Sequence, residues 1–157
     1  ASDVYKRQVV SKLLSIVEPY NVYFGEKDFQ QLRIIENLVF EKKINTKVIR
    51  CETLRDSDGL ALSSRNSKLS FSSKKIATNL FKALNFAKEK FSTLDIFEIE
   101  KKVTEKMRAH PEIKLVYFMI ADEEKLEPSI SRNNKKNRAF IAAYISGVRL
   151  IDNIKLY

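Results

Sequence analysis

The sequence has little of several residues that would shape a fold by themselves: one cysteine, three glycines, three prolines and no tryptophan among 157 residues. The single cysteine, Cys51, excludes a disulfide within the chain, which fits a reducing compartment. So few glycines and prolines argue against long irregular linkers. No apolar run is long enough to cross a membrane, and no signal peptide is visible. We therefore predict a cytoplasmic protein with no membrane partner.

The charge is strongly positive, with a formal net charge of +9 and a pI near 9.6. Such an excess can indicate a nucleic-acid partner or an anionic substrate. It can also arise from lysines spread over solvated helix faces. The basic pairs Lys42-Lys43, Lys74-Lys75 and Lys101-Lys102 have acidic residues between them, which favours the second explanation. We therefore predict no nucleic-acid partner, and the 44% of hydrophobic residues predicts a folded core.

Residues 1–8 stand apart from the rest of the chain. The run Asp3–Gln8 resembles a translation of a transposon end sequence used in preparing sequencing libraries. We interpret residues 1–8 as a sequencing or cloning scar and expect the natural protein to begin further upstream, so that the chain is a fragment. A genuine basic N-terminal arm is the alternative.

Residues 9–66 predict part of an α/β domain. Apolar residues recur at helical spacing from Val9 to Val17, and two short β-prone segments, residues 21–24 and 47–52, flank an amphipathic helix over residues 28–43. Asp28 can cap that helix, with Gln31 in capping-box position. Strand, helix and strand in close succession predict a parallel βαβ unit. Because parallel strands need neighbouring strands and covering helices, this unit is expected to be half of a larger sheet that exposes apolar surface.

Residues 67–157 predict a small, separate α+β domain. Apolar residues from Ile76 to Phe91 form one amphipathic helix, with Ser70 or Ser72 as its cap, and those from Ile96 to Met107 form a second. Three strands follow, and the last two flank Gly147, which predicts an antiparallel hairpin. These strands are expected over residues 113–121, 138–146 and 148–156.

The first loop whose residues could bind a ligand is Gly25–Asp28, directly after a strand and at the start of a helix. Ligands of α/β proteins bind outside the carboxyl ends of the strands. A glycine there permits close approach of a nucleotide, and a lysine offers a charge for phosphate. Gln31 lies one helical turn beyond Lys27 and can face the same ligand. The alternative is purely structural: the glycine turns the chain, Asp28 caps the helix and Lys27 is solvated.

The second such loop runs from Asp58 to Asn66 and contains Ser63, Ser64 and Arg65. Serine hydroxyls donate hydrogen bonds to phosphate, and arginine pairs with it bidentately. Two serines and an arginine are by themselves more often a helix cap. Their position after the second strand of the βαβ unit allows both loops to emerge at one edge of the sheet.

Together these loops resemble the pantothenate synthetases. The strings that carry the resemblance are FGEKDFQQL at residues 24–32, DGLALSSRN at 58–66 and RLIDNIKL at 149–156, and the similarity runs from about Val9 to the end. The family implies the second half of a Rossmann-like nucleotidyltransferase domain followed by a smaller C-terminal domain that closes over the site. It also implies an ATP- and Mg²⁺-dependent ligase that condenses pantoate with β-alanine through pantoyl adenylate. Such enzymes are typically cytoplasmic homodimers.

The resemblance also assigns roles to individual residues. Gln31 would bind pantoate, and the charges of Lys27 and Arg65 would offset negative charge that develops at the α-phosphate. Leu54 would contact the nucleotide through its backbone. The ATP site as a whole would comprise Gly25, Glu26, Lys27, Asp28, Leu54, Leu62, Ser63, Ser64 and Arg65.

One family feature is missing. The family's His-x-Gly-His motif does not occur in this sequence, and the only histidine, His110, precedes Pro111 at the predicted end of a helix. We interpret His110 as a surface or cap residue, expect no catalytic residue in this chain, and expect the chain alone not to form pantoyl adenylate at a useful rate. A basic nucleic-acid-binding domain and another adenylate-forming nucleotidyltransferase remain the alternative functions.

Overall fold

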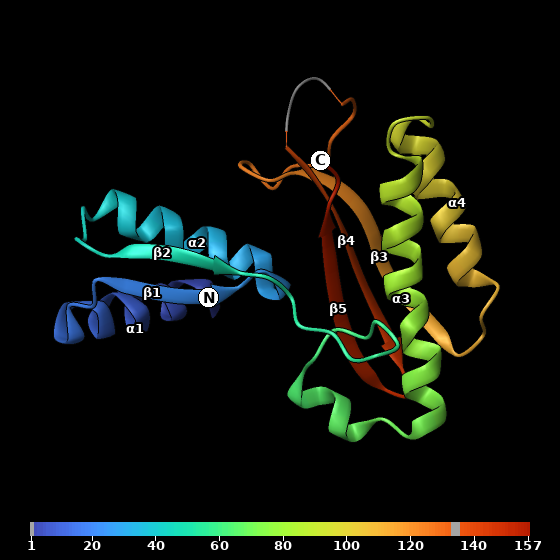
Figure 1. Ribbon diagram of the computed structural model, residues 1–157, viewed down its shortest axis with the longest axis horizontal. Coiled ribbons are helices and arrows are strands. Elements are labelled where there is room, and N and C mark those ends of the chain that lie inside the picture. The colour runs from blue at the N-terminus through green and yellow to red at the C-terminus, as the bar shows by residue number, and fades with distance from the viewer. Residues whose placement is uncertain (1, 133–135) are drawn as a thin grey trace. The chain divides into compact units, whose positions relative to one another are not determined.

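The computed structural model describes residues 2–132 and 136–157 of the chain, and its contacts divide it into two compact units (Figure 1). The first unit ends at Thr53, and the second runs from Leu54 to Tyr157. In the described residues, no helix has both the length and the apolar character needed to cross a membrane.

The first unit is a parallel βαβ unit preceded by a helix. Its elements are α1 (Ser2–Val17), β1 (Asn21–Gly25), the 3₁₀ turn η1 (Glu26–Asp28), α2 (Phe29–Glu41) and β2 (Lys47–Cys51). The two strands pair in parallel, with Asn21 opposite Lys47 and Gly25 opposite Cys51. The predicted α/β class and the predicted parallel pairing are therefore confirmed.

Helix α1 begins earlier than the pattern from Val9 indicated. Its first described residue is Ser2, and Arg7 forms an ion pair with Glu41 of α2 at 2.5 Å. Residues 2–8 contain no glycine or proline to stop a helix that has already nucleated further along. Ala1 lies outside the described residues, and the origin of residues 1–8 as a scar remains a prediction.

The predicted capping box at the start of α2 is wrong. Asp28 occupies the N-cap position, but its side chain makes no capping hydrogen bond. Its backbone, with φ −96° and ψ 58°, continues from the preceding 3₁₀ turn and departs from the extended conformation typical of a capping residue. The Asp28 carboxylate lies instead 3.8 Å from the Lys27 Nζ atom.

The second unit is a three-stranded antiparallel sheet packed against two helices. Its elements are η2 (Ser64–Lys68), α3 (Phe71–Lys90), α4 (Ile96–Arg108), β3 (Ile113–Asp122), β4 (Asn137–Ile145) and β5 (Val148–Lys155), with β4 in the centre of the sheet. Helices α3 and α4 lie together on one side of the sheet (Figure 1). Both helices and all three strands contribute to one continuous apolar core, so the predicted α+β unit is confirmed.

Local signals account for the ends of these elements. The Ser70 hydroxyl accepts a hydrogen bond from the Ser73 amide at 3.1 Å, so Ser70 rather than Ser72 caps α3. Ser146 and Gly147 both have positive φ, 50° and 76°. Two such residues in a row form the tight turn that suits an antiparallel hairpin, and they join β4 to β5 as predicted.

The segment between the units belongs by its contacts to the second one. Its residue Arg55 pairs with Asp152 of β5, and residues 54–66 accordingly group with residues 67–157. The division by contacts therefore falls at Thr53 and Leu54. The functional domain boundary that the sequence analysis places between residues 66 and 67 remains a prediction.

Candidate functional site

The glycine of the first loop is not required by the fold of its own unit. Gly25 has an extended backbone, with φ −71° and ψ 134°, which any residue adopts. A Cβ atom built on it would meet no atom within 4 Å. A purely structural turn therefore does not explain this glycine. Because glycine has no side chain, a ligand could approach the backbone closely at the carboxyl end of β1.

The charged residues of the same loop form one short 3₁₀ turn that leads into α2. The Lys27 side chain is only 16% exposed, so it is not the fully solvated lysine of the structural alternative. Asp28 is 62% exposed beside it. Glu26 and Gln31 are half-buried, and Gln31 lies in the first turn of α2. The structure thus brings Gly25, Glu26, Lys27, Asp28 and Gln31 together at one end of the parallel strand pair.

A charge cluster that the sequence analysis missed connects the middle of α2 to β2. The Glu36 carboxylate accepts from Arg33 at 2.5 Å and from Arg50 at 2.6 and 2.9 Å. Burial opposes ionisation of Glu36, but the hydrogen bonds and charges of Arg50 and Arg33 outweigh it and hold the pKa below its ordinary value. The Arg50 guanidinium also lies 5.4 Å from the ring centre of Phe29. The i,i+3 spacing of Arg33 and Glu36 was the available signal.

The second loop forms a tight hairpin whose ends lie side by side. The Leu62 amide donates to the Leu54 carbonyl at 2.8 Å, and Arg55 and Ala61 form an antiparallel bridge just inside it. Leu54 and Leu62 are 73% and 50% exposed. Two residues that the sequence analysis singled out separately, one of them with no chemistry of its own, are therefore direct neighbours at the mouth of this hairpin.

Ser63, Ser64 and Arg65 continue from that mouth into η2. The Ser63 hydroxyl accepts from the Arg65 amide at 3.2 Å and so caps η2, as the structural alternative for this segment expects. A hydroxyl that accepts in this way still has its own proton to donate. Ser64 and Arg65 are exposed, and the Asn66 amide group donates to the Ala61 carbonyl at 3.0 Å. Leu54 and the continuous segment from Leu62 to Arg65 therefore lie side by side in the second unit.

The turn of this hairpin requires its glycine. Gly59 has φ +90°, and a Cβ atom there would lie 2.5 Å from the Phe81 ring of α3. The Asp56 carboxylate accepts from the amides of Asp58 at 3.0 Å and Leu60 at 2.9 Å. The Asp58-Gly59 pair signalled a turn in the sequence, but the contact with Phe81 was not visible there.

His110 has a structural position. Its backbone amide donates to Met107 at 3.1 Å, and its carbonyl accepts from Ile113 at 3.0 Å, which joins the end of α4 to the start of β3. Its side chain is half-buried. These contacts agree with the interpretation of His110 as a residue that ends a helix.

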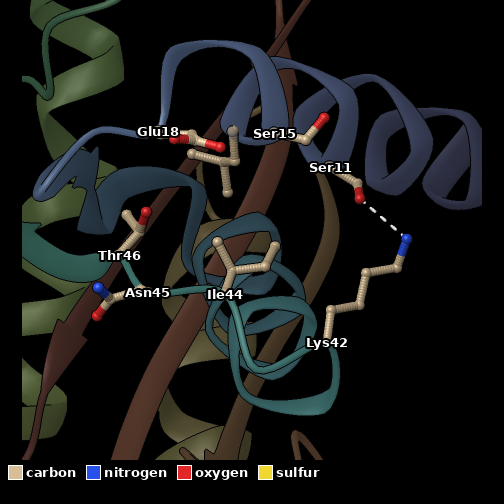
Figure 2. A pocket seen from close by; sticks show the side chains of 8 residues that line it. Ser11, Ser15, Glu18, Lys42, Ile44, Asn45 and Thr46 are labelled. Atoms are coloured by element: carbon tan, nitrogen blue, oxygen red, sulfur yellow. Dashed lines mark hydrogen bonds between the residues drawn. The ribbon is translucent and has the colours of Figure 1, made fainter.

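A cavity of roughly 470 Å³, lined mostly by polar residues, lies in the first unit (Figure 2). Two of its lining residues are joined to each other, because the Lys42 Nζ atom donates to the Ser11 hydroxyl at 2.9 Å (Figure 2). Glu18 precedes β1, and Asn45 and Thr46 precede β2, so the cavity lies at the amino ends of the strands. Ligands of parallel sheets bind at the opposite, carboxyl ends. This cavity is therefore not the candidate site.

Comparisons with known proteins point in one direction. The family model described as pantoate-beta-alanine ligase matches residues 6–155. The chain is 44% identical over 149 residues to a pantothenate synthetase of Flavobacterium psychrophilum, covering 94% of the chain and 53% of that relative. It is 42% identical over 153 residues to a bifunctional pantoate ligase/cytidylate kinase of Trichodesmium erythraeum, covering 94% of the chain and 29% of that relative.

Solved structures show the same likeness. A pantothenate synthetase from Thermus thermophilus superimposes with a TM-score of 0.90 at 36% identity, over 96% of this chain and 55% of that one. A pantoate-beta-alanine ligase from Francisella tularensis, complexed with Beta-gamma ATP and Beta-alanine, gives a TM-score of 0.67 at 38% identity, over 96% and 49%. The chain spans about half the length of the pantothenate synthetases it matches.

Proposed function

The chain belongs to the pantoate–β-alanine ligase family, and on that premise we propose that it supplies part of an enzyme that condenses pantoate with β-alanine at the expense of ATP. A carboxylate oxygen of pantoate attacks the α-phosphorus of ATP, and the bond to the β-phosphate breaks to release pyrophosphate. The amine of β-alanine then attacks the acyl carbon of pantoyl adenylate, loses a proton and displaces AMP. Family membership favours neither alternative function.

The observation that carries the proposal is the exposed, continuous segment from Leu62 to Arg65 beside Leu54. Two hydroxyls and a guanidinium in sequence suit a triphosphate, because each group donates to phosphate oxygens. The Beta-gamma ATP in the Francisella tularensis relative supports a nucleotide as the ligand. We propose that Gly25, Glu26, Lys27 and Asp28 form the other part of the ATP site and that Gln31 binds pantoate.

The proposed roles of the charged residues follow from the charge that develops in adenylation. Attack at the α-phosphorus increases negative charge on the phosphate oxygens. Lys27 and Arg65 would offset this charge if both groups reach one triphosphate, which is the convergence that the sequence analysis predicts. Since the transition state needs further donors, we expect the chain alone to show no useful rate of adenylation.

Mg²⁺ would enter this reaction with the phosphates of ATP. Among residues 2–132 and 136–157, no group of three or more His, Cys, Asp or Glu side chains is gathered to hold a metal. A magnesium ion bound through substrate phosphates needs no such cage, because it retains several of its waters. We therefore propose that the metal arrives with the phosphates of the substrate. We further propose a cytoplasmic homodimer for the complete enzyme, as the family implies.

Binding of MgATP to this chain tests the proposal. We expect Arg65→Ala and Lys27→Ala each to weaken MgATP binding by about tenfold, which is typical of one charge-assisted hydrogen bond to phosphate. Isothermal titration calorimetry at about 0.15 M ionic strength, where the Debye length is about 8 Å, measures the affinity.

Two exposed lysines provide matched controls. Lys68→Ala removes a charge from the same 3₁₀ segment as Arg65, and Lys47→Ala removes one from the amino end of β2. Lys47→Ala should retain the affinity of the parent chain to within about twofold, the small effect expected of a distant charge screened by solvent, whereas Lys68→Ala, one 3₁₀ turn from Arg65, should cost less than Arg65→Ala. An affinity that falls equally in all four variants would indicate non-specific attraction to a basic protein, and no measurable binding by the parent chain would reject the nucleotide site.

A further inference from the structure

Arg55, near the start of the second loop, is held by a residue nearly a hundred positions further along the chain. Its Nη1 atom donates to the Oδ2 atom of Asp152 at 2.6 Å, and its Nη2 atom donates to Oδ1 at 2.9 Å. This is the bidentate geometry in which an arginine is most firmly oriented. The side chain of Arg55 is 17% exposed and that of Asp152 is 4% exposed. The start of the loop is therefore fixed to β5 by a pair that water hardly reaches.

Phe81 of α3 holds the same hairpin from a second side. The Arg55 guanidinium carbon lies 3.8 Å from the centre of the Phe81 ring, which is a close cation–π contact. The ring edge also closes over Gly59, where a Cβ atom would lie 2.5 Å away. Arg55 donates in addition to the Gly59 carbonyl at 3.1 Å. We name Arg55, Phe81 and Asp152 together the clamp.

The clamp acts at the base of the segment proposed to bind phosphate. Arg55 forms a bridge with Ala61, and the next pair outward is Leu54 and Leu62, joined at 2.8 Å. Ser63 follows immediately. Arg55 is thus adjacent to Leu54, and Ala61 is adjacent to Leu62. A shift of Arg55 therefore moves the Leu54–Leu62 pair and, through Leu62, also Ser63.

We propose that Arg55 and Asp152, with Phe81, are positioning residues that fix the geometry of the phosphate-binding segment Leu62–Asn66. The inference deepens the proposed function and rests on it for the identity of the ligand. Stability alone does not explain such a pair, because burying two charges costs about as much as their attraction returns. What the pair does supply is orientation: phosphate donors that are already in place lose less conformational freedom when the nucleotide binds.

Hydrogen exchange measured by NMR on the whole chain tests the positioning without any ligand. In Asp152→Asn, which keeps the shape of the side chain and removes its charge, the amides of Leu62 and Asn66 should exchange at least about tenfold faster relative to the amide of Ala143 in β4. Ala143 reports global opening because it is fully buried in the central strand. Arg55→Lys should act in the same direction, since it keeps the charge but loses the bidentate fork.

A second buried ion pair in the same unit is the matched control. Glu123 and Arg138 lie 2.7 Å apart, with side chains 3% and 2% exposed, and neither belongs to the hairpin. Arg138 also donates to Asn153, the neighbour of Asp152, at 2.6 Å, so the control variant changes Glu123 and leaves that bond in place. Glu123→Gln should accelerate exchange at Leu62, Asn66 and Ala143 by the same factor. If Asp152→Asn does not fold, Arg55→Lys and Phe81→Leu test the same point with Asp152 intact. Equal acceleration at all three amides in the clamp variants, or selective opening of the loop in Glu123→Gln, would overturn the proposal.

Titration with MgATP separates this inference from the proposed function. Asp152→Asn should weaken MgATP binding by about tenfold while Glu123→Gln leaves it unchanged, as expected when a local ordering cost is added to binding. Unchanged affinity in a variant whose loop has opened would overturn the positioning role even if the parent chain binds ATP. Failure of the parent chain to bind MgATP would reject the nucleotide ligand, whereas selective opening of the loop would still support the clamp.

Discussion

The first unit buries one face of one helix, whereas the second unit encloses a core of its own. In the first unit the fully covered apolar side chains beyond α1 are four residues of α2, namely Phe29, Leu32, Ile35 and Leu38. Many apolar side chains of α1, of β1 and of the turn between them remain more than half exposed, among them Val9, Leu13, Ile16, Val17, Tyr20 and Tyr23. The second unit contributes every member of the continuous core.

This contrast shows how the two kinds of sheet are completed. An antiparallel sheet with helices on one side can bury its apolar face within a single short segment. Two parallel strands cannot, because they need neighbours and cover on both faces. The predicted exposure of apolar surface is therefore observed in the first unit, and the second unit is expected to be the more stable of the two.

The largest effect should come from truncation in the core of the second unit. Ile141 in β4 and Ile35 in α2 are both 0% exposed. Ile141→Ala should lower the free energy of unfolding of the second unit by about 2–5 kcal/mol, because it leaves a cavity in a close-packed core. Ile35→Ala should fall at or below the lower end of that range, because a small core can collapse around the gap. Urea titration followed by residue-resolved NMR gives both values, and a single transition shifted equally by both variants would refute the contrast.

Glycine substitutions distinguish the two candidate loops. Gly59→Ala should destabilise the second unit by about 1–3 kcal/mol, because it imposes a positive φ on alanine and overlaps Phe81. Gly25→Ala should leave the stability of the first unit within about 0.5 kcal/mol, since its φ is ordinary and its surroundings are open. Gly147→Ala, with a positive φ but no clash, should lie between them. A Gly25→Ala cost equal to that of Gly59→Ala would show that the first loop also needs its glycine for folding.

The helix caps provide a smaller test. Ser70→Ala should cost about 1 kcal/mol, because the Ser73 amide loses its partner. Asp28→Ala should cost only about a few tenths of a kcal/mol, because its carboxylate makes no capping hydrogen bond. Thermal unfolding of both variants measures the difference. A larger loss of stability for Asp28→Ala than for Ser70→Ala would show that Asp28 does cap α2, contrary to the structure.

The smallest effects concern pH, and they have opposite signs in the two units. The pKa of Glu36 is lowered, so its contribution to stability is present above the unfolded value near 4.5 and is lost as pH falls through the folded pKa. Burial raises the pKa of Glu100, opposed by the hydrogen bond from the Ile120 amide. Ionised Glu100 therefore destabilises the folded state, and this loss of stability sets in as pH rises above the unfolded value near 4.5.

Neutral variants separate the two contributions. Glu36→Gln should destabilise the first unit at pH 7 and flatten its loss of stability in acid. Glu100→Gln should slightly stabilise the second unit at pH 7, by about 0.5 kcal/mol or less, while its amide oxygen still accepts from Ile120. Urea titrations at pH 7 and pH 4 check both signs. Destabilisation of the second unit by Glu100→Gln at pH 7 would contradict the burial argument.

The short-range pattern of residues determined the elements of this protein and their order. Apolar spacing located α2, α3 and α4, β-prone runs located all five strands, and Gly147 located the hairpin. Ser70 and the strings around residues 24–32 and 58–66 could also be identified, because caps, turns and motifs are written in adjacent residues. Ser63, Ser64 and Arg65 were proposed as binding residues for the same reason, whereas Leu54 was proposed only from the resemblance to the family.

Tertiary structure alone decided which distant residues meet. The pairing of Arg55 with Asp152 and of Arg138 with Glu123 depends on the register of β5 and β4, and no local period reports that register. The missing cap at Asp28 depends on the 3₁₀ turn before it, and the need for Gly59 depends on a ring that α3 brings alongside. The two ion pairs and the contact between Gly59 and Phe81 join segments that are far apart in the chain, so they exist only once the fold has formed. The missing cap depends instead on the local backbone of the preceding turn.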